Sequence, residues 1–254
     1  MKKPLIKVQT SENLHSNKSN SRRHFLKMGG LAVAGSSLLL VGCSDDDDDP
    51  MTNPPAGDVF DLGSGDVGIL NYAYALEQLE AAFYTKVLDG SYWMGLSAGK
   101  EKTILEDLYN HEVIHREFFK TALGAAASAN MVLPELEFDF SGVDFTSRAS
   151  VLGTAKVLED TGVAAYNGAG KLISNTDYLL IAGKIVSVEA RHASAIADLI
   201  NPGSTDFAGD SVLVDIGGSG VAYDKATAPK DIITAVGATG FIKTKFTANN
   251  LPTS

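Results

Sequence analysis

The sequence predicts an all-α protein, a four-helix bundle with one long crossover between its second and third helices. Three observations predict this fold. The chain contains four segments with a helical apolar stripe, their connections are uneven in length, and every stripe includes at least one glutamate. The segments repeat apolar residues at intervals of three and four, the spacing of one helix face, over about 66–88, 99–123, 147–173 and 176–200.

The connections define the order of the helices. About ten residues, DGSYWMGLSA, join the first segment to the second, and about three, SNT, join the third to the fourth. Each of these pairs is therefore expected to form an antiparallel hairpin. More than twenty residues separate the second and third segments, with Pro134 and an alternating apolar pattern that no single helix fits. This stretch is long enough to run the length of a bundle, so we expect two hairpins joined by a crossover.

The C-terminal residues 201–254 differ in composition from the helical part, being rich in Gly, Thr and Asp. SVLVDI fits a short strand and PKDIITAVG a short helix. We expect an irregular extension that packs on the bundle, and we assign it no chemistry.

The N-terminal part resembles an export signal. SRRHFLK, with Arg22 and Arg23, precedes the apolar run GGLAVAGSSLLLVG and then Cys43. This order resembles a twin-arginine signal ending in a lipoprotein cleavage box, and the run is too short to span a bilayer. The alternative is a disordered basic tail with a free cysteine. The resemblance implies a signal at 1–42, an acidic lipidated linker at 43–65, the bundle at 66–200 and the extension at 201–254.

This resemblance also implies location and partners. The chain would pass through the twin-arginine translocase and the lipoprotein-processing machinery, and a lipid on Cys43 would anchor it to the membrane, on the periplasmic side or at the cell surface. The acidic run Asp45 to Asp49 fits a solvated tether, and is similar to a surface-sorting signal of some bacterial lipoproteins. Cys43 is the one cysteine in the chain, so its acylation would exclude disulfides, iron–sulfur clusters and cysteine catalysis.

The charge balance excludes a nucleic-acid surface. Of 21 basic and 31 acidic residues, seven basic and one acidic lie in residues 1–42, which leaves 14 and 30, a net charge of −16. A surface this acidic repels a phosphate backbone, so no nucleic-acid partner is expected.

Ionisable residues interrupt all four apolar stripes. The second and fourth segments each carry Glu-x-x-His, and the first and third each carry a glutamate followed seven residues later by a tyrosine. The two halves of the chain therefore repeat one pattern and would face each other across a pseudo-twofold axis. The residues expected to meet at its midpoint are Glu77, Glu112, His115, Glu159, Glu189 and His192.

Such a set is tolerable inside a protein only with cations. Four buried carboxylates repel one another, whereas two divalent ions balance their charge. Glutamate and histidine three residues apart lie on one helix face, close enough to hold one ion between them. Oxygen-rich ligation with one imidazole per ion favours iron, with manganese as the alternative. The sequence therefore predicts a buried site for two metal ions.

Several neighbours are candidates for a supporting role. Glu80 shares the stripe of Glu77, but the repeat aligns Glu77 with Glu159 and Glu80 with Gly162, so Glu77 is the expected ligand. Tyr84 and Tyr166 could hydrogen-bond a ligand carboxylate, donate an electron, or serve as core aromatics. Arg191 is a further candidate, and His111 points about a third of a turn away from Glu112, toward a supporting or surface position.

These residues resemble the ferritin-like superfamily, in particular exported bacterial ferritin-like domain-containing proteins related to desiccation-associated proteins. The resemblance covers about 66–200. It implies that Glu112 and Glu189 bridge two metal ions, that Glu77 and Glu159 are terminal ligands, and that each histidine binds one ion. EARH, residues 189–192, is similar to the Glu-x-Arg-His of di-iron enzymes, where an Asp often precedes the Glu; here Val188 stands in that place.

The resemblance implies a di-iron oxidoreductase of the cell envelope, of ferroxidase or peroxidase type, that oxidises Fe(II) or reacts with O₂ or peroxide under stress. Two alternatives stay open: a non-catalytic protective protein with a structural or vestigial metal site, and a manganese catalase-like dismutase. A lipid anchor argues against a closed storage shell, and the lack of further cysteines argues against a rubrerythrin-type electron donor site. Association as a homodimer is compatible with the sequence.

Overall fold

The computed structural model describes residues 59–209, 212–216 and 221–253. The predicted export signal, with Arg22 and Arg23, and the predicted lipid anchor at Cys43 lie outside the described residues.

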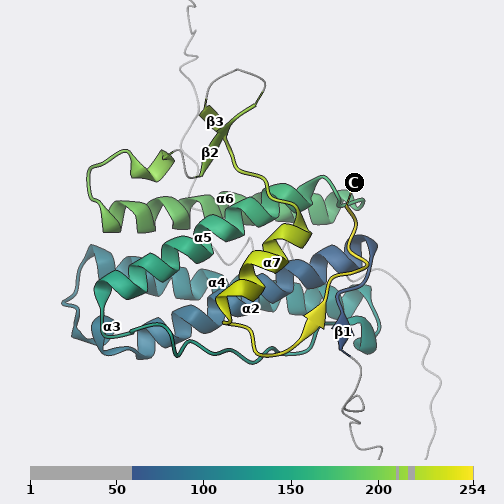
Figure 1. Ribbon diagram of the computed structural model, residues 1–254, viewed down its shortest axis with the longest axis horizontal. Helices are drawn as coiled ribbons and strands as arrows, with labels where there is room; N and C mark the ends of the chain where they lie inside the picture. Colours follow the sequence, from purple (N-terminus) through teal and green to yellow (C-terminus); the bar gives the residue numbers. More distant parts are fainter. Residues whose placement is uncertain (1–58, 210–211, 217–220, 254) are drawn as a thin grey trace, which may run out of the picture. The chain divides into compact units, whose positions relative to one another are not determined.

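Four long helices run side by side and form the body of the molecule (Figure 1). They are α2 (Gly65–Asp89), α4 (Lys100–Ala126), α5 (Arg148–Gly170) and α6 (Thr176–Ile200). The prediction of an all-α bundle is confirmed. Within the part of the chain that the structure describes, no helix has the length and apolar character needed to cross a lipid bilayer.

The helices form where the sequence supplies a buried stripe and a start signal. Ser147 caps α5 by accepting a hydrogen bond from the amide of Ser150, and Asn175 caps α6 by accepting from the amides of Asp177 and Tyr178. The positions expected to face inward on α2 and α5 are all buried. These include their glutamates, so the apolar stripes carry carboxylates into the core.

The connections follow the predicted hairpin–crossover–hairpin order. A short helix, α3 (Ser91–Gly95), lies between α2 and α4, and the crossover between α4 and α5 contains the 3₁₀ turn η1 (Ala129–Met131). Two buried amides of α2 hold this crossover to the bundle. Asn71 donates to the carbonyl of Met131 and accepts from the amide of Leu133. Gln78 accepts from the amide of Leu136 and donates to the carbonyl of Pro134, so the two side chains satisfy four backbone groups of the crossover.

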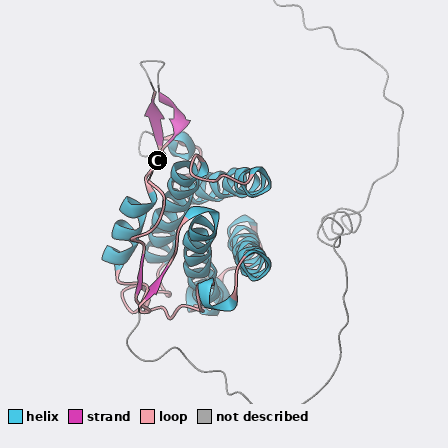
Figure 2. Cartoon of the chain, turned by 90° about the vertical axis from the view of Figure 1, so that its right-hand side faces the viewer, coloured by secondary structure: helices cyan, strands magenta, loops and turns pink. Residues whose placement is uncertain are grey.

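The C-terminal extension covers one side of the bundle. It contains η2 (Asp206–Ala208), the hairpin of β2 (Leu213–Asp215) and β3 (Val221–Asp224), α7 (Pro229–Thr239) and β4 (Phe246–Thr247). β4 pairs in parallel with β1 (Phe60–Asp61), which joins the two ends of the described chain (Figures 1 and 2). Ile232 and Val236 of α7 are buried, so the extension contributes apolar area to the core.

Gly168 is the tightest contact between the bundle and this extension. A Cβ atom at this position of α5 would lie 1.8 Å from the carbonyl oxygen of Thr227, whose amide donates to the Ala164 carbonyl. The clash is with backbone, which cannot rotate away. We expect Gly168→Ala to lower the free energy of unfolding by about 1–3 kcal/mol and to expose the extension to proteolysis. Thermal denaturation and limited proteolysis measure both effects.

Gly153 supplies the matched control for this variant. It lies on the exposed side of the same helix, and a Cβ there meets nothing within 4 Å. Gly153→Ala should therefore stabilise the protein, by up to about 1 kcal/mol, through helix propensity alone. Equal effects of the two variants would contradict the packing argument.

Candidate metal centre

All six predicted ligands converge at the middle of the bundle, from four different helices. The four glutamates are fully buried and His192 is 3 % exposed, whereas the His115 side chain is 12 % exposed. The side chains form two overlapping groups of four, each with three carboxylates and one imidazole. The first group is Glu77, Glu112, His115 and Glu189, and the second is Glu112, Glu159, Glu189 and His192.

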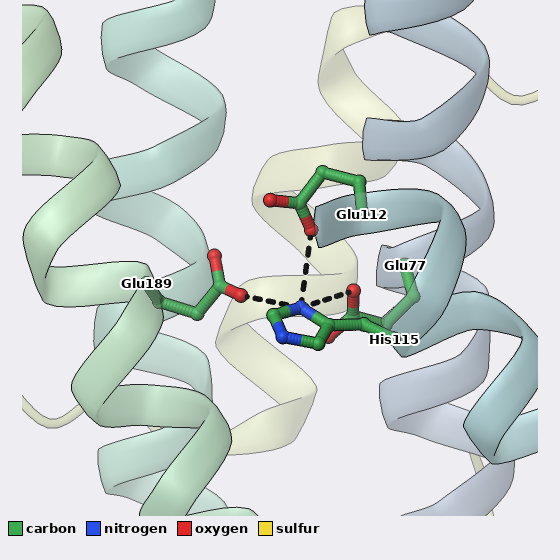
Figure 3. A group of neighbouring side chains, drawn as sticks. All are labelled: Glu77, Glu112, His115 and Glu189. Atoms are coloured by element: carbon green, nitrogen blue, oxygen red, sulfur yellow. Dashed lines mark ion pairs between the residues drawn. The ribbon is translucent and has the colours of Figure 1, made fainter. Parts of the chain in front are cut away.

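Figure 3 shows the first group, in which the Nδ1 atom of His115 faces one carboxylate from each of three helices. This nitrogen lies 2.9 Å from Oε1 of Glu189. It lies 3.4 Å from an oxygen of Glu77 and 3.4 Å from an oxygen of Glu112. The imidazole and the three carboxylates thus surround one point.

The second group repeats this arrangement with the other imidazole. Nδ1 of His192 lies 2.8 Å from Oε1 of Glu112 and 3.3 Å from Oε2 of Glu159. Oε2 of Glu189 lies 3.5 Å from the same nitrogen. Glu112 and Glu189 belong to both groups and present a different oxygen to each imidazole, as ligands that bridge two ions must.

The geometry fits metal ligands better than a hydrogen-bonded cluster. Eight buried atoms of the two groups lack a hydrogen-bond partner, although they lie within 3.5 Å of oppositely polar atoms. Leaving buried polar atoms unpaired is costly. Two donor atoms bound to one ion at about 2.1 Å and at right angles lie about 3 Å apart, which is the spacing found here. The distances between each imidazole nitrogen and its three carboxylates are therefore compatible with a metal ion in each group.

Two tyrosines hold the terminal carboxylates and link the helix hairpins. Tyr84 of α2 donates a 2.5 Å hydrogen bond to Oε1 of Glu159 on α5. Tyr166 of α5 donates in return to Oε1 of Glu77 on α2. Each tyrosine thus supports the glutamate of the opposite half of the repeat and leaves the second oxygen of that glutamate directed at the centre. The bonds show that hydroxyl groups orient these two carboxylates.

Glu80 is a fifth buried carboxyl group at the centre, outside both groups of four. A Cβ atom on Gly162 would lie 3.0 Å from Oε1 of Glu80 and 3.7 Å from Oε2 of Glu189. The carboxyl of Glu80 therefore fills the space that a side chain at its repeat partner, Gly162, would take. Burial, together with the negative charge of Glu189, raises the pKa of Glu80 well above its usual range. A neutral Glu80 adds no further negative charge to the centre.

The two other candidates, Arg191 and His111, differ in whether they reach the centre. Arg191 does not reach the centre: it is exposed, and its guanidinium donates to the Ser187 carbonyl of its own helix. The expectation that it supports the centre is therefore wrong, because its position on α6 faces away from the bundle. His111 does reach a ligand, and its Nδ1 lies 2.9 Å from Nε2 of His192. Burial and the two neighbouring histidines lower the pKa of His111.

Without metal, protons would balance the centre. Burial and the charge of Glu189 raise the pKa of Glu112 to about 8, and burial raises that of Glu159 to about 7 against the effect of His192. Burial opposes charge on Glu189 as well, but the facing imidazoles outweigh it and lower its pKa to about 2. Burial likewise lowers the pKa of the two ligand histidines, and the surrounding carboxylates outweigh it and raise them. The metal-free centre therefore holds protons where the ions would bind.

This proton content predicts how metal stabilisation depends on pH. Unfolded glutamates titrate near about pH 4.3, so between there and pH 8 the folded, metal-free chain holds more protons than the unfolded chain. Its stability must then fall as pH rises, and the histidines act in the same direction above about pH 6.5. Metal displaces these protons, so its affinity rises with pH.

We expect the difference in Tm between metal-loaded and chelated protein to widen from about pH 5.5 to about pH 8, as thermal denaturation would measure. A difference that narrows over this range would contradict the assignment of these groups as ligands.

Comparison with known proteins agrees with the fold and the site. A family model described as a ferritin-like domain matches residues 65–202, which includes all four helices and all six residues of the two groups. No curated protein sequence matches this chain. The matched segment is more than half of the 254 residues, and the chain belongs to the ferritin-like domain family.

Proposed function

We propose that the protein is a di-iron carboxylate protein of the bacterial cell envelope that oxidises Fe(II) or reacts with O₂ or peroxide. One observation supports this more than any other: two buried groups of three carboxylates and one imidazole share Glu112 and Glu189. A shared pair of carboxylates would hold two ions close together, and two adjacent ferrous ions could together supply two electrons to O₂ or peroxide. The ferritin-like fold is compatible with this chemistry.

Each residue of the two groups would bind one or both ions. Glu112 and Glu189 would hold both ions, Glu77 and His115 the first, and Glu159 and His192 the second. Iron bound there would supply redox chemistry with O₂ or peroxide. Tyr84 and Tyr166 fix the carboxylates of Glu159 and Glu77, and the burial of all four glutamates would keep bulk water away from bound ions. His115 is the more exposed of the two imidazoles, so a small substrate would meet the centre on its side.

The proposal includes a location. The twin-arginine pattern at Arg22 and Arg23 and the lipoprotein box at Cys43 support export of the folded protein and anchoring by lipid. Export in the folded state would allow the metal to be loaded before transport. The acidic run Asp45 to Asp49 would keep the bundle at a distance from the membrane, at the periplasmic side or the cell surface.

The test is metal analysis followed by rapid mixing. Protein folded and exported in its own host should contain about two iron ions per chain, and the reduced protein should consume O₂ or peroxide with a change in its optical spectrum. The variant Glu189→Gln should show neither. Two manganese ions would favour the dismutase instead. Metal-free protein that shows no O₂ or peroxide consumption after Fe(II) is added would contradict the proposal and favour a non-catalytic protective protein.

A further inference from the structure

The two imidazoles of the centre differ in what holds them. His192 makes a hydrogen bond through Nε2, the nitrogen that faces away from the carboxylates. Its partner is Nδ1 of His111 on α4, 2.9 Å away, and the planes of the two rings are nearly parallel, with 10° between them and centroids 5.1 Å apart. His115 makes no such bond to any residue in the described ranges, and its side chain is 12 % exposed. The asymmetry comes from one residue: His111 precedes Glu112, whereas Val188 precedes Glu189 in the second half of the repeat.

The surroundings of His192 determine where its proton lies. Nδ1 faces Glu112, Glu159 and Glu189, so a metal ion in that group would take the Nδ1 lone pair. The ring must then carry its proton on Nε2, which donates to Nδ1 of His111. His111 acts as the acceptor and keeps its own proton on Nε2, the nitrogen farther from His192. The tautomers of both rings are thus set by geometry, in one continuous chain from the metal to the exposed surface of α4.

We propose that His111 is a positioning residue for His192, and that it makes the metal site of His192 the tighter of the two. The proposal rests on the di-metal centre proposed above. A partner on the outer nitrogen of a ligand histidine fixes the ring's orientation and tautomer and raises its basicity toward the metal. In many metal sites a carboxylate or backbone carbonyl has this role. Here the neutral imidazole of His111, on the neighbouring helix, has this role. Val188, the residue before Glu189, has an apolar side chain and provides no such partner.

Two substitutions at this position separate the hydrogen bond from the mere presence of a side chain. His111→Leu keeps bulk but removes the acceptor. His111→Asn restores it, because the Oδ1 atom of asparagine can occupy the place of Nδ1. Asn110→Ala is the matched control, because Asn110 is the exposed neighbour on the same helix and belongs to neither group of four. His111 is itself exposed, so its variants should fold as the native protein does.

The experiment is anaerobic titration of each full-chain protein with Fe(II), with the two binding steps resolved by calorimetry. We expect His111→Leu to bind one ion as the native protein does and the other about 10- to 100-fold more weakly. His111→Asn and Asn110→Ala should bind both ions with native affinity. Nitrogen-15 spectra of the metal-loaded protein should show the His192 proton on Nε2, and free imidazole added to a His111→Ala variant should recover part of the lost affinity.

The outcomes separate this inference from the function on which it rests. A native protein that binds no Fe(II) overturns both. Native protein with two sites, beside a His111→Leu variant that keeps both affinities or loses both equally, overturns only the role of His111. Failure of His111→Asn to restore the weak site would also overturn it, because the argument requires an acceptor and nothing else.

Discussion

Glu189→Gln is expected to lose both metal ions, whereas Glu77→Gln is expected to lose one. Glu189 presents one oxygen to each imidazole and belongs to both groups of four, while Glu77 belongs to the first group alone. Removing one anion from a buried, charge-balanced group costs about 3–5 kcal/mol, which is roughly two to four orders of magnitude in affinity. Metal content after gel filtration, with anaerobic Fe(II) titration, measures the stoichiometry.

Glu80→Gln provides the control for these variants. Glu80 is buried, as the predicted ligands are, and lies on the same helix face as Glu77, but it is outside both groups, and burial together with the charge of Glu189 raises its pKa. Replacing a neutral carboxyl group by an amide of the same shape should leave two ions bound. If Glu80→Gln lost an ion while Glu77→Gln kept both, the assignment of the first-group ligand would be wrong.

Removal of the metal is expected to lower Tm by roughly 10–20 °C. Each ion at 100 times its Kd contributes about 2.7 kcal/mol of stability, and 1 kcal/mol corresponds to about 2–4 °C for a domain of this size. The physical reason is that the metal-free centre must balance its buried carboxylates with protons, whereas two bound ions would neutralise them directly. Scanning calorimetry of loaded and chelated protein near neutral pH gives the difference.

Re-addition of metal is the control for this measurement, because it should restore the higher Tm fully. The Glu189→Gln variant should show no difference between loaded and chelated samples. Identical melting of native loaded and chelated protein would mean that the cluster is stable without cations, and the account of its charge balance would fail.

The helices could be predicted from the sequence because the information is local. Apolar spacing and capping residues such as Asn175 act within one helix turn, and the observed helices lie close to the predicted segments. Convergence of the glutamates could be inferred as well, because the buried stripes of the four helices in a bundle all face the same core. The repeat aligns Glu77 with Glu159. Glu80 has no glutamate as its counterpart, because its own carboxyl group fills the space that a side chain at Gly162 would take.

Contacts between helices could not be predicted in the same way. The position of His111 on α4 gives its direction relative to Glu112. It does not show that His111 contacts His192, because this contact depends on how closely α6 packs against α4. The tyrosines were candidates for several roles, and only the packed structure shows that each bonds to the opposite half's glutamate. Arg191 is a candidate in the sequence because predicted ligands lie beside it, but its side chain is exposed and donates to the Ser187 carbonyl of α6.

The extension shows the same limit at longer range. A parallel pair between Phe60 and Phe246 joins residues nearly 190 positions apart, and no local pattern specifies it. In the sequence, Asn71 and Gln78 are two polar positions of the first helix with no pattern that indicates their role. Their function, satisfying the backbone of the crossover, follows only from what lies beside them in the fold.

The most direct test of the metal centre is anomalous X-ray scattering from crystals of protein folded in its own host, recorded at the iron and manganese edges. The account predicts two peaks about 3.5–4 Å apart, both in contact with Glu112 and Glu189, with one beside each ligand imidazole. A centre with no peak, or with a single ion among all six side chains, would contradict it.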